Sequence, residues 1–297
     1  MSFVTRFAPS PTGPLHLGHA FSALTAWDLA TRHGGRFLLR IEDIDTSRAR
    51  PEWEARIYDD LAWLGIGWSE PVLRQSRNMN AYREALGRLR DMGLTYACTC
   101  RRRDIEAAAS APQEGTEPVH GPDGLVYPGT CRGAGHAEEG AALRLDMAGA
   151  LSRLRGIQWK ELGNDQAEAF EISHERAMSE IGDIVLARRG MGTSYHLSVV
   201  VDDAAQGVTD VVRGRDLAPA TPIHVILQHL LDLPRPVYRH HRLIRDDTGK
   251  RLAKRDDARS IATYREAGAT PDDIRRMVDH APSGRINSTS SPWRRPV

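Results

Sequence analysis

The sequence has few of the features that mark secreted, membrane-bound or nucleic-acid-coating proteins. Only three of its 297 residues are cysteine, an odd number that suits a metal or reduced-thiol pattern better than a disulfide framework. No apolar run approaches the roughly 18 residues needed to cross a bilayer, and the opening "MSFVTRFAPS" lacks the regions of a signal peptide. The net charge is only +1, so any nucleic-acid contact would depend on local patches. We therefore expect a cytoplasmic protein that does not bind membranes.

What is present indicates a globular protein whose chain begins with a βαβ unit. The hydrophobic fraction of 40% and the charged fraction of 27% are typical of soluble domains. Residues 3–8 and 36–43 read as buried strands, and residues 17–35 between them have apolar positions at helical spacing and end in two glycines. This order predicts a parallel sheet with a right-handed crossover.

Further elements follow along the chain, interrupted by one segment without periodicity. Residues 110–140 are rich in Gly, Pro and Glu and read as an inserted loop region. Helices are predicted over 51–65, 79–93, 220–233, 260–267 and 271–279. Strand-like runs lie at 141–147, 157–162, 183–189, 195–203 and 209–217, and a strand leading into a basic loop covers 237–257. The tail 281–297 has the composition of a disordered end.

The stretch "APSPTGPLHLGHA", residues 8–20, is the most unusual in composition. Gly13 and Gly18 allow backbone to approach a ligand closely. His16 and His19 share one face of a helix start, where free N–H groups and a partial positive charge suit a phosphate. Two imidazoles there can hydrogen-bond phosphate oxygens as charge develops. A capped helix with two surface histidines is the alternative interpretation.

The string "PSPTGPLHLGH" resembles the HIGH-type signature of class I aminoacyl-tRNA synthetases, in the form of the glutamyl and glutaminyl branch. Downstream, "KRLAKRD" resembles the KMSKS loop, whose lysines meet ATP phosphates, and Lys254 matches the second lysine of that loop. Arg251 replaces its first lysine and Ala253 its serine. The resemblance extends over about residues 3–260.

By this resemblance, "RFAPSPTG", "RIEDID", "YHLSVVVDD" and "VVRGRDL" contain the residues that contact glutamate. These residues are Arg6, Ala8, Ser10, Glu42, Tyr195 and Arg213. Glu42 suits the ammonium group, Arg213 or Arg6 can present a bidentate fork to a carboxylate, and Tyr195 can donate a hydrogen bond. Taken singly, such a tyrosine or glutamate is usually a core or ion-pair residue.

The resemblance also implies ATP with Mg²⁺ and formation of glutamyl-adenylate. The residues that it places at ATP are Pro9, Gly18, His19 and Lys254. Catalysis then consists of positioning and charge stabilisation, with His16, His19 and Lys254 as the catalytic residues.

Three cysteines bracket the loop region and predict a structural zinc site. Cys98 and Cys100 form a C-x-C pair, and Cys131 can close on them. Simple chemistry favours His120 or His136 as fourth ligand. The pattern C-x-C…Y-x₃-C resembles that of the glutamyl-queuosine tRNA(Asp) synthetases, which implies Tyr127 instead. Three free or buried thiols are the alternative.

The predicted fold is α/β, a Rossmann-like class I catalytic domain with an inserted zinc-bearing subdomain and a short helical C-terminal part. We expect the catalytic domain in two parts, 1–97 and 141–240, with the insertion at 98–140. A KMSKS-like loop and helical end cover 241–280, and the disordered tail covers 281–297.

The resemblance to the glutamyl-queuosine tRNA(Asp) synthetases implies that the acceptor is the queuosine base in the anticodon loop of tRNA(Asp). Only 43 residues follow Lys254 (297 − 254), which is below the roughly 50 residues of a small domain, so we expect no anticodon-binding domain. We expect a monomer. Two alternatives remain: a shortened glutamyl-tRNA synthetase that charges a 3′ end, and a non-catalytic RNA- or nucleotide-binding paralogue.

Overall fold

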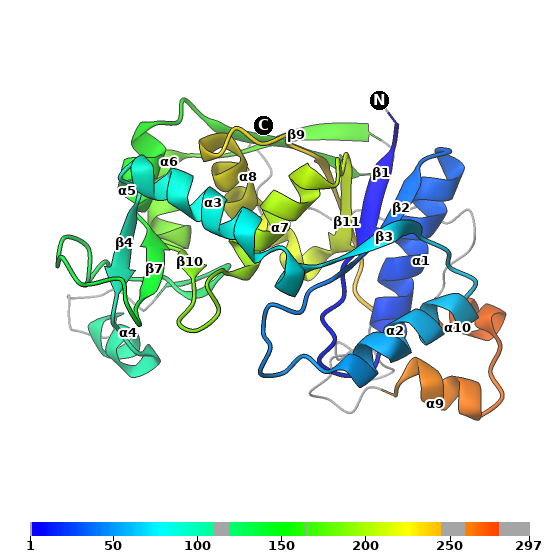
Figure 1. Ribbon diagram of the computed structural model, residues 1–297. Helices are drawn as coiled ribbons and strands as arrows, with labels where there is room; N and C mark the ends of the chain where they lie inside the picture. The colour runs from blue at the N-terminus through cyan, green and yellow to red at the C-terminus, as the bar shows by residue number, and fades with distance from the viewer. Residues whose placement is uncertain (1, 110–118, 164–165, 245–258, 279–297) are drawn as a thin grey trace.

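The computed structural model describes all residues except 1, 110–118, 164–165, 245–258 and 279–297, and it has an α/β fold (Figure 1). The strands are β1 Val4–Phe7, β2 Arg36–Ile41, β3 Ser69–Arg74, β4 Thr95–Cys98, β5 His120–Gly121, β6 Gly124–Leu125, β7 Ala142–Leu145, β8 Ile157–Gly163, β9 Gln166–Ile172, β10 Val185–Ala187, β11 Asp210–Gly214 and β12 Val237–His241. The helices are α1 Leu17–Arg32, α2 Pro51–Trp63, α3 Met79–Asp91, α4 Arg102–Ala109, α5 Met147–Ser152, α6 His174–Arg176, α7 Tyr195–Ala205, α8 Thr221–Leu230, α9 Ile261–Glu266 and α10 Pro271–Met277. Short turns of helix are η1 Gln75–Arg77, η2 Ala177–Ile181 and η3 Arg215–Ala220.

Two sets of parallel strands meet in the middle of the molecule. One sheet has the order β1-β2-β3, and the other has the order β11-β12-β8-β9 with β9 antiparallel. Strands β1 and β11 lie side by side, since the Thr209 N–H donates to the Val4 carbonyl at 2.9 Å. The predicted βαβ unit is confirmed, because β1 and β2 are parallel and α1 connects them.

A separate antiparallel sheet lies on the side of the molecule opposite to β1, β2 and β3 (Figure 1, left). Its order is β10-β7-β4, and β4 leads directly into the cysteine-bearing segment. The predicted loop region contains one element within its described residues, a hairpin of β5 and β6.

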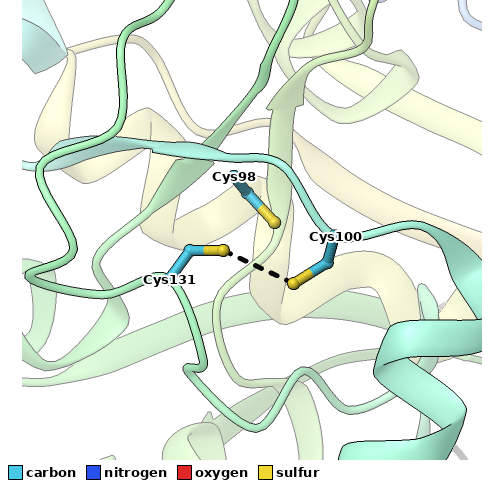
Figure 2. Close-up of side chains that lie close together, drawn as sticks. All are labelled: Cys98, Cys100 and Cys131. Atoms are coloured by element: carbon cyan, nitrogen blue, oxygen red, sulfur yellow. Dashed lines mark hydrogen bonds between the residues drawn. The ribbon is translucent and has the colours of Figure 1, made fainter.

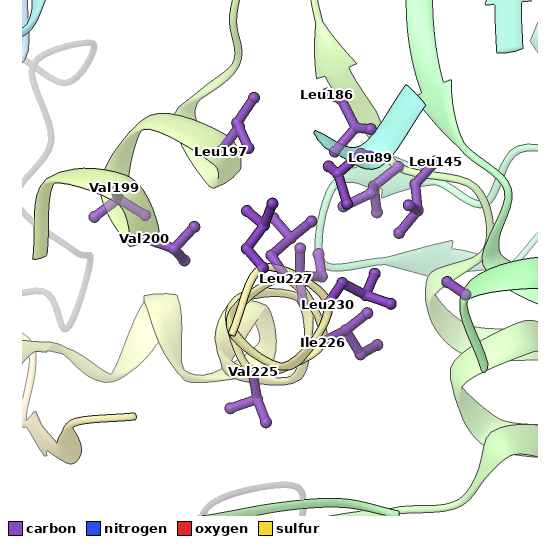
Figure 3. Packing of buried hydrophobic residues seen from close by; sticks show 14 of the residues in the cluster. Leu89, Leu145, Leu186, Leu197, Val199, Val200, Val225, Ile226, Leu227 and Leu230 are labelled. Atoms are coloured by element: carbon purple, nitrogen blue, oxygen red, sulfur yellow. The ribbon is translucent and has the colours of Figure 1, made fainter. Parts of the chain in front are cut away.

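Helix α8 is central to the larger hydrophobic core (Figure 3). It is buried on nearly all sides, as expected for a helix that is apolar around its circumference. Side chains of α7, β7 and β10 pack around it, and they include Val199, Leu145 and Leu186. A second cluster joins α1 and α2 to β1 and β2. Each of the two sheets that contain parallel strands therefore packs against a hydrophobic cluster.

One predicted strand is wrong: residues 195–203 belong to helix α7, not to a strand. Their run of valines is typical of a buried strand, but a short apolar run does not distinguish a buried strand from a buried helix. Ser194 decides the outcome locally, because its hydroxyl accepts a hydrogen bond from the Leu197 N–H at 3.4 Å and caps the helix. The helix is buried against α3 and α8, so valine is tolerated along it.

Candidate active site and metal centre

The two histidines of the opening motif form the N-terminal cap of α1. His16 Nδ1 accepts from the Gly18 N–H at 3.1 Å, and His19 Nδ1 accepts from the His16 N–H at 3.1 Å. Because both Nδ1 atoms act as acceptors, the neutral rings carry their proton on Nε2, which is a donor for a phosphate oxygen. The cap and the phosphate-binding interpretation are therefore compatible. The centroids of the two imidazole rings lie 3.8 Å apart, so the rings are in contact.

Gly18 is required for this arrangement of rings. A Cβ on residue 18 would lie 3.0 Å from the His16 ring, closer than side chains normally approach. The same residues line a cavity of about 150 Å³ between α1 and the chain that follows β11 and β12. Its lining includes His16, His19, Asp216 and His241. A helix N-terminus with imidazole donors and a cavity beside it suits a nucleotide phosphate.

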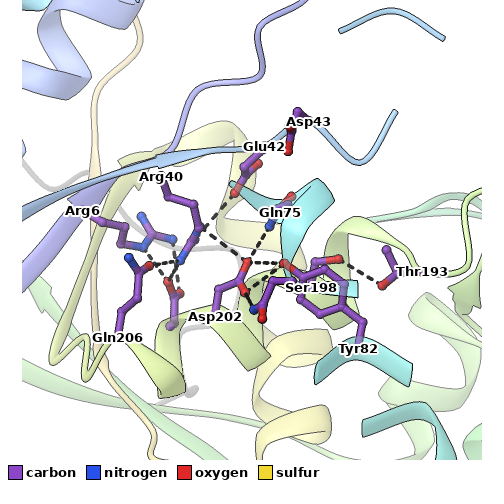
Figure 4. Close-up of polar contacts among 12 residues, drawn as sticks. Arg6, Arg40, Glu42, Asp43, Gln75, Tyr82, Thr193, Ser198, Asp202 and Gln206 are labelled. Carbon is purple, nitrogen blue, oxygen red and sulfur yellow. Dashed lines mark hydrogen bonds and ion pairs between the residues drawn. The ribbon is translucent and has the colours of Figure 1, made fainter. Parts of the chain in front are cut away.

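A buried ion-pair network underlies the end of β1 and β2 (Figure 4). Arg6 donates to Asp203 at 2.9 and 3.3 Å, and Arg40 donates to the same carboxylate at 2.7 Å. Arg40 is fully buried, and its guanidinium also lies 3.6 Å from the Glu42 carboxylate. Arg6 and Arg40 therefore share the negative charge of Asp203.

The neighbouring carboxylate of α7 is held by neutral groups. Asp202 accepts from Gln75 at 2.8 Å, from Asn78 at 2.8 Å and from the Tyr82 hydroxyl at 2.9 Å. Its shortest distance to Arg40 is 3.9 Å. Together, Asp202 and Asp203 fasten α7 to β2 and to the start of α3.

The pKa values of two carboxyl groups in this network are shifted in opposite directions. Burial raises the pKa of Glu42 to about 7, although Arg40 and Arg6 oppose the shift. For Asp203 burial also acts upward, but Arg6 and Arg40 outweigh it and hold its pKa below the usual range. Asp203 is therefore the ionised partner of the arginines, whereas Glu42 gains or loses its proton near neutral pH.

The residues that the resemblance assigned to glutamate gather around the ends of β1 and β11. Burial raises the pKa of Tyr195, and Arg213, Glu42 and Arg6 all act on it electrostatically, so these four side chains share one neighbourhood. The loop after β1 closes it, because the Glu42 N–H donates to the Pro9 carbonyl at 3.1 Å. In that loop Pro9 is buried, Ala8 half-buried and Ser10 exposed.

The three cysteines form a compact group (Figure 2). The sulfur atoms of Cys98, Cys100 and Cys131 all lie within 4.8 Å of one another. The Tyr127 hydroxyl lies 3.5 Å from Cys98 Sγ and 3.4 Å from Cys100 Sγ, and it accepts from the Cys131 N–H at 2.8 Å. The Arg144 guanidinium lies 3.8 Å from the Tyr127 ring centroid. The geometry thus brings a phenol to the three thiols.

This group fits a tetrahedral zinc ion. Zn–S bonds of about 2.3 Å place two sulfurs roughly 3.8 Å apart, and Cys100 Sγ and Cys131 Sγ are 3.4 Å apart. Burial raises the pKa of the Cys131 thiol, but hydrogen bonds from Tyr127 and the backbone outweigh it and lower the value to about 6. His120 and His136 are exposed, and neither belongs to the group of ligand atoms found among the described residues.

The basic loop with Lys254, Arg251 and Ala253 lies outside the described residues, as does the predicted tail 281–297. Arg40, Asp202 and Asp203 were not among the site residues predicted from the sequence. The sequence features that could have identified them are a charged residue inside an apolar strand, "RFLLRI", and two adjacent acidic residues after three valines.

Within the described part of the chain, no helix is both long and apolar enough to span a bilayer.

Comparison with protein families gives a match over nearly the whole chain. Residues 2–281 match the family described as "tRNA synthetases class I (E and Q), catalytic domain". The "Glutamyl-Q tRNA(Asp) synthetase" of Rhodobacter capsulatus is 61% identical over 282 residues, which cover 93% of this chain and 99% of that protein. The protein of the same name from Nocardia farcinica is 46% identical and covers 92% of this chain and 82% of its own length.

Solved structures confirm the fold. The glutamate-tRNA synthetase of Elizabethkingia anophelis superposes with a TM-score of 0.74 at 24% identity, over 96% of this chain. This chain spans 64% of the length of that protein. The methionyl-tRNA synthetase of Mycobacterium tuberculosis, bound to methionyl-adenylate, gives a TM-score of 0.59 at 10% identity. At these identities the likeness concerns the fold alone.

Proposed function

The chain belongs to the family of glutamyl-Q tRNA(Asp) synthetases, with a class I catalytic domain of the Glu and Gln type, and we propose that it transfers glutamate to queuosine in tRNA(Asp). It is an enzyme of the aminoacyl-tRNA synthetase type. The observation that carries the proposal is the 61% identity with the Rhodobacter capsulatus protein over 99% of its length.

In the first step, an α-carboxylate oxygen of glutamate attacks the α-phosphorus of ATP, and the bond to pyrophosphate breaks. In this proposal ATP binds at the start of α1, and the Nε2–H groups of His16 and His19 donate to phosphate oxygens; the support is that the Nδ1 atoms of both rings already accept from the helix cap. Gly18 and Pro9 shape the backbone around it. Lys254 adds a positive charge, and Mg²⁺ accompanies the triphosphate. The residues thus stabilise charge that develops in the transition state.

Glutamate lies among Arg6, Glu42, Tyr195 and Arg213. Glu42 in its ionised form receives the ammonium group, and Arg213 receives the side-chain carboxylate. Arg6 already donates two hydrogen bonds to a protein carboxylate, that of Asp203, so Arg213 is the better partner of the two arginines for the carboxylate of the amino acid. Ala8 and Ser10 line the loop that approaches the amino acid.

Cys98, Cys100, Tyr127 and Cys131 would hold a zinc ion in a structural role. The described part of the segment around these residues has a small core: its hydrophobic cluster consists of Cys98, Tyr127 and Cys131, with Tyr96, Cys100 and Ile105 packed against it. A four-ligand ion would fasten the segment in place of apolar burial.

In the second step, a hydroxyl of the queuosine cyclopentene diol attacks the acyl carbon of the adenylate, AMP leaves, and the hydroxyl proton is lost. A single-stranded anticodon loop suits such a reaction, because its bases can be splayed out into a pocket. We place the reaction in the cytoplasm, with the protein as a monomer.

Pyrophosphate exchange tests the first step. Glutamate should support exchange of labelled pyrophosphate into ATP without any tRNA, and glutamine should not, because the neutral amide leaves the arginine unpaired. Absolute dependence on a tRNA would instead indicate a shortened glutamyl-tRNA synthetase. Absence of exchange with glutamate under both conditions would leave only the non-catalytic alternative.

A further inference from the structure

Arg213 is held by an unbroken series of buried polar side chains. Its Nε–H donates to His240 Nε2 at 3.2 Å, and its Nη1–H donates to His224 Nδ1 at 3.1 Å. Its Nη2–H donates to the Thr221 hydroxyl at 2.7 Å. Arg213 is 4% exposed and His224 is 2% exposed, so these contacts are shielded from water.

The hydrogen bonds determine which nitrogen of each ring carries the proton. A guanidinium only donates, so His224 Nδ1 and His240 Nε2 are acceptors and both rings carry their proton on the other nitrogen. His224 Nε2 accordingly donates to His196 Nδ1 at 3.2 Å. His240 Nδ1 donates to Glu161 Oε2 at 3.2 Å. Both rings that touch Arg213 are therefore neutral.

Carboxylates occur only at the outer ends of this series. Glu161 lies beyond His240, and Asp123, in the turn between β5 and β6, lies 3.5 Å from His196 Nε2. Among the described residues no carboxylate lies within ion-pair distance of Arg213. Arg6 differs in this respect, since it makes two hydrogen bonds to Asp203. Arg6 is therefore held by a charged carboxylate, whereas Arg213 is held by neutral acceptors.

Burial disfavours charge on both rings. It lowers the pKa of His224 well below the usual range, with Arg213 acting in the same direction. It also lowers the pKa of His240, although Glu161 opposes the shift. A second positive charge beside Arg213 is thereby avoided, and the acceptor nitrogens stay available to it.

We propose that His224 and His240 are positioning residues that fix the Arg213 guanidinium with neutral acceptors, which keeps its charge for the side-chain carboxylate of the amino acid and favours glutamate over glutamine. This inference rests on the proposed function, in which Arg213 meets that carboxylate. Acidic residues in place of the two histidines would hold the guanidinium equally well but would compete with the ligand.

Two substitutions of His224 that have the same size and differ in charge separate the effect of a negative charge beside Arg213 from the effect of losing the imidazole. Asparagine at position 224 retains an acceptor near the place of Nδ1, and aspartate adds a negative charge in the same shape. We expect His224→Asn to weaken glutamate binding by no more than about tenfold, the cost of one altered neutral hydrogen bond. We expect His224→Asp to weaken it by at least about 100-fold, as for a lost charge pair, and to abolish the preference for glutamate over glutamine.

The measurement is isothermal titration of the full chain with glutamate and with glutamine, beside the melting temperature of each variant. His229→Asp is the control: it adds the same charge to the same helix, at a residue bonded to Arg235, and should bind glutamate like the wild type. If His224→Asp does not fold, the pair His240→Gln and His240→Glu makes the same comparison.

Two results would contradict the proposal in different ways. Equal glutamate affinity in the neutral and acidic members of a folded pair would overturn the positioning role alone, since a structural role predicts equal effects of isosteric changes. No glutamate binding by the wild type would remove the proposed function and this inference with it.

Discussion

The proposed glutamate site, which consists of Arg6, Glu42, Tyr195 and Arg213, and the thiol group of residues 98–131 differ in what holds their side chains. The glutamate site takes its residues from β1, the position after β2, α7 and β11, and a large core with α8 at its centre supports it. The thiol group takes its ligands from 34 consecutive residues (131 − 98 + 1), and the described part of this segment has a cluster of only three buried residues. The glutamate site should therefore tolerate loss of the metal, whereas the cysteine segment should not.

Removal of a zinc ligand is the most drastic test of this difference. Cys131→Ser should reduce the zinc content from about one per chain to nearly none, because serine is not deprotonated to a good ligand. Amide exchange should rise in residues 119–136, while glutamate-dependent pyrophosphate exchange stays within about a factor of two of wild type, as for independent sites. Elemental analysis and hydrogen exchange provide the readouts.

The fourth ligand is tested in the same experiment. Tyr127→Phe should lose zinc, whereas His120→Ala and His136→Ala should retain it. Full zinc in Tyr127→Phe together with loss in a histidine variant would show that the fourth ligand is a histidine.

The ion-pair network of Arg6, Arg40 and Asp203 tests what supports the glutamate site. Asp203→Asn leaves Arg6 and Arg40 buried without their shared carboxylate, and we expect a loss of about 3–5 kcal/mol in the free energy of unfolding. Urea denaturation measures it, with the exposed Asp91→Asn as control. Zinc content per folded chain should not change. A loss of less than about 1 kcal/mol in the free energy of unfolding would mean that the ion-pair network does not support the glutamate site.

The contribution of Lys254 to the charge around the ATP phosphates can be tested independently of the glutamate site and the thiol group. Lys254→Ala should lower the rate of pyrophosphate exchange by about 100-fold, a typical loss for one electrostatic donor. The affinity for glutamate should change much less, because the residue meets ATP and not the amino acid. A wild-type rate would assign the role to Lys250 or Arg251, or to no residue of that loop.

The smallest expected effect is a pH dependence. The pKa of Glu42 is raised to about 7, so in the free protein the group is mostly neutral below that value and ionised above it. Its partner, an ammonium group, requires the ionised form. Glutamate affinity should therefore fall as pH decreases below 7, by up to about tenfold per pH unit. Titrations from pH 5.5 to 8 measure it, and a slope that persists in Glu42→Gln would exclude this residue as the cause.

The proximity of candidate side chains was predictable where they lie close in the sequence. His16 and His19 lie at a predicted helix start, and one residue separates Cys98 from Cys100, so local spacing alone brings each pair together. The partners that hold Arg6 and Arg213 were not predictable in this way. Asp203 lies 197 residues from Arg6, and His224 and His240 reach Arg213 only after α8 and β12 have packed against β11.

The fold was predictable where periodicity was unambiguous. Helices α1, α2, α3 and α8 and strands β1, β2 and β11 were found from it. Helix α7 was misread because its valine run fits a buried strand as well as a buried helix. Strand β9, Gln166–Ile172, was missed because alanine and glutamate, which are poor strand formers, occupy four of its seven positions, and its β-structure depends on pairing with β8.

Transfer of labelled glutamate to tRNA(Asp) tests the central proposal most directly. Two samples of the same tRNA are compared, from cells that make queuosine and from cells that do not. We predict that only the first becomes labelled, and that nuclease digestion places the label in the anticodon loop. Label on the 3′-terminal adenosine of tRNA(Glu), with none on queuosine-containing tRNA(Asp), would contradict the proposal.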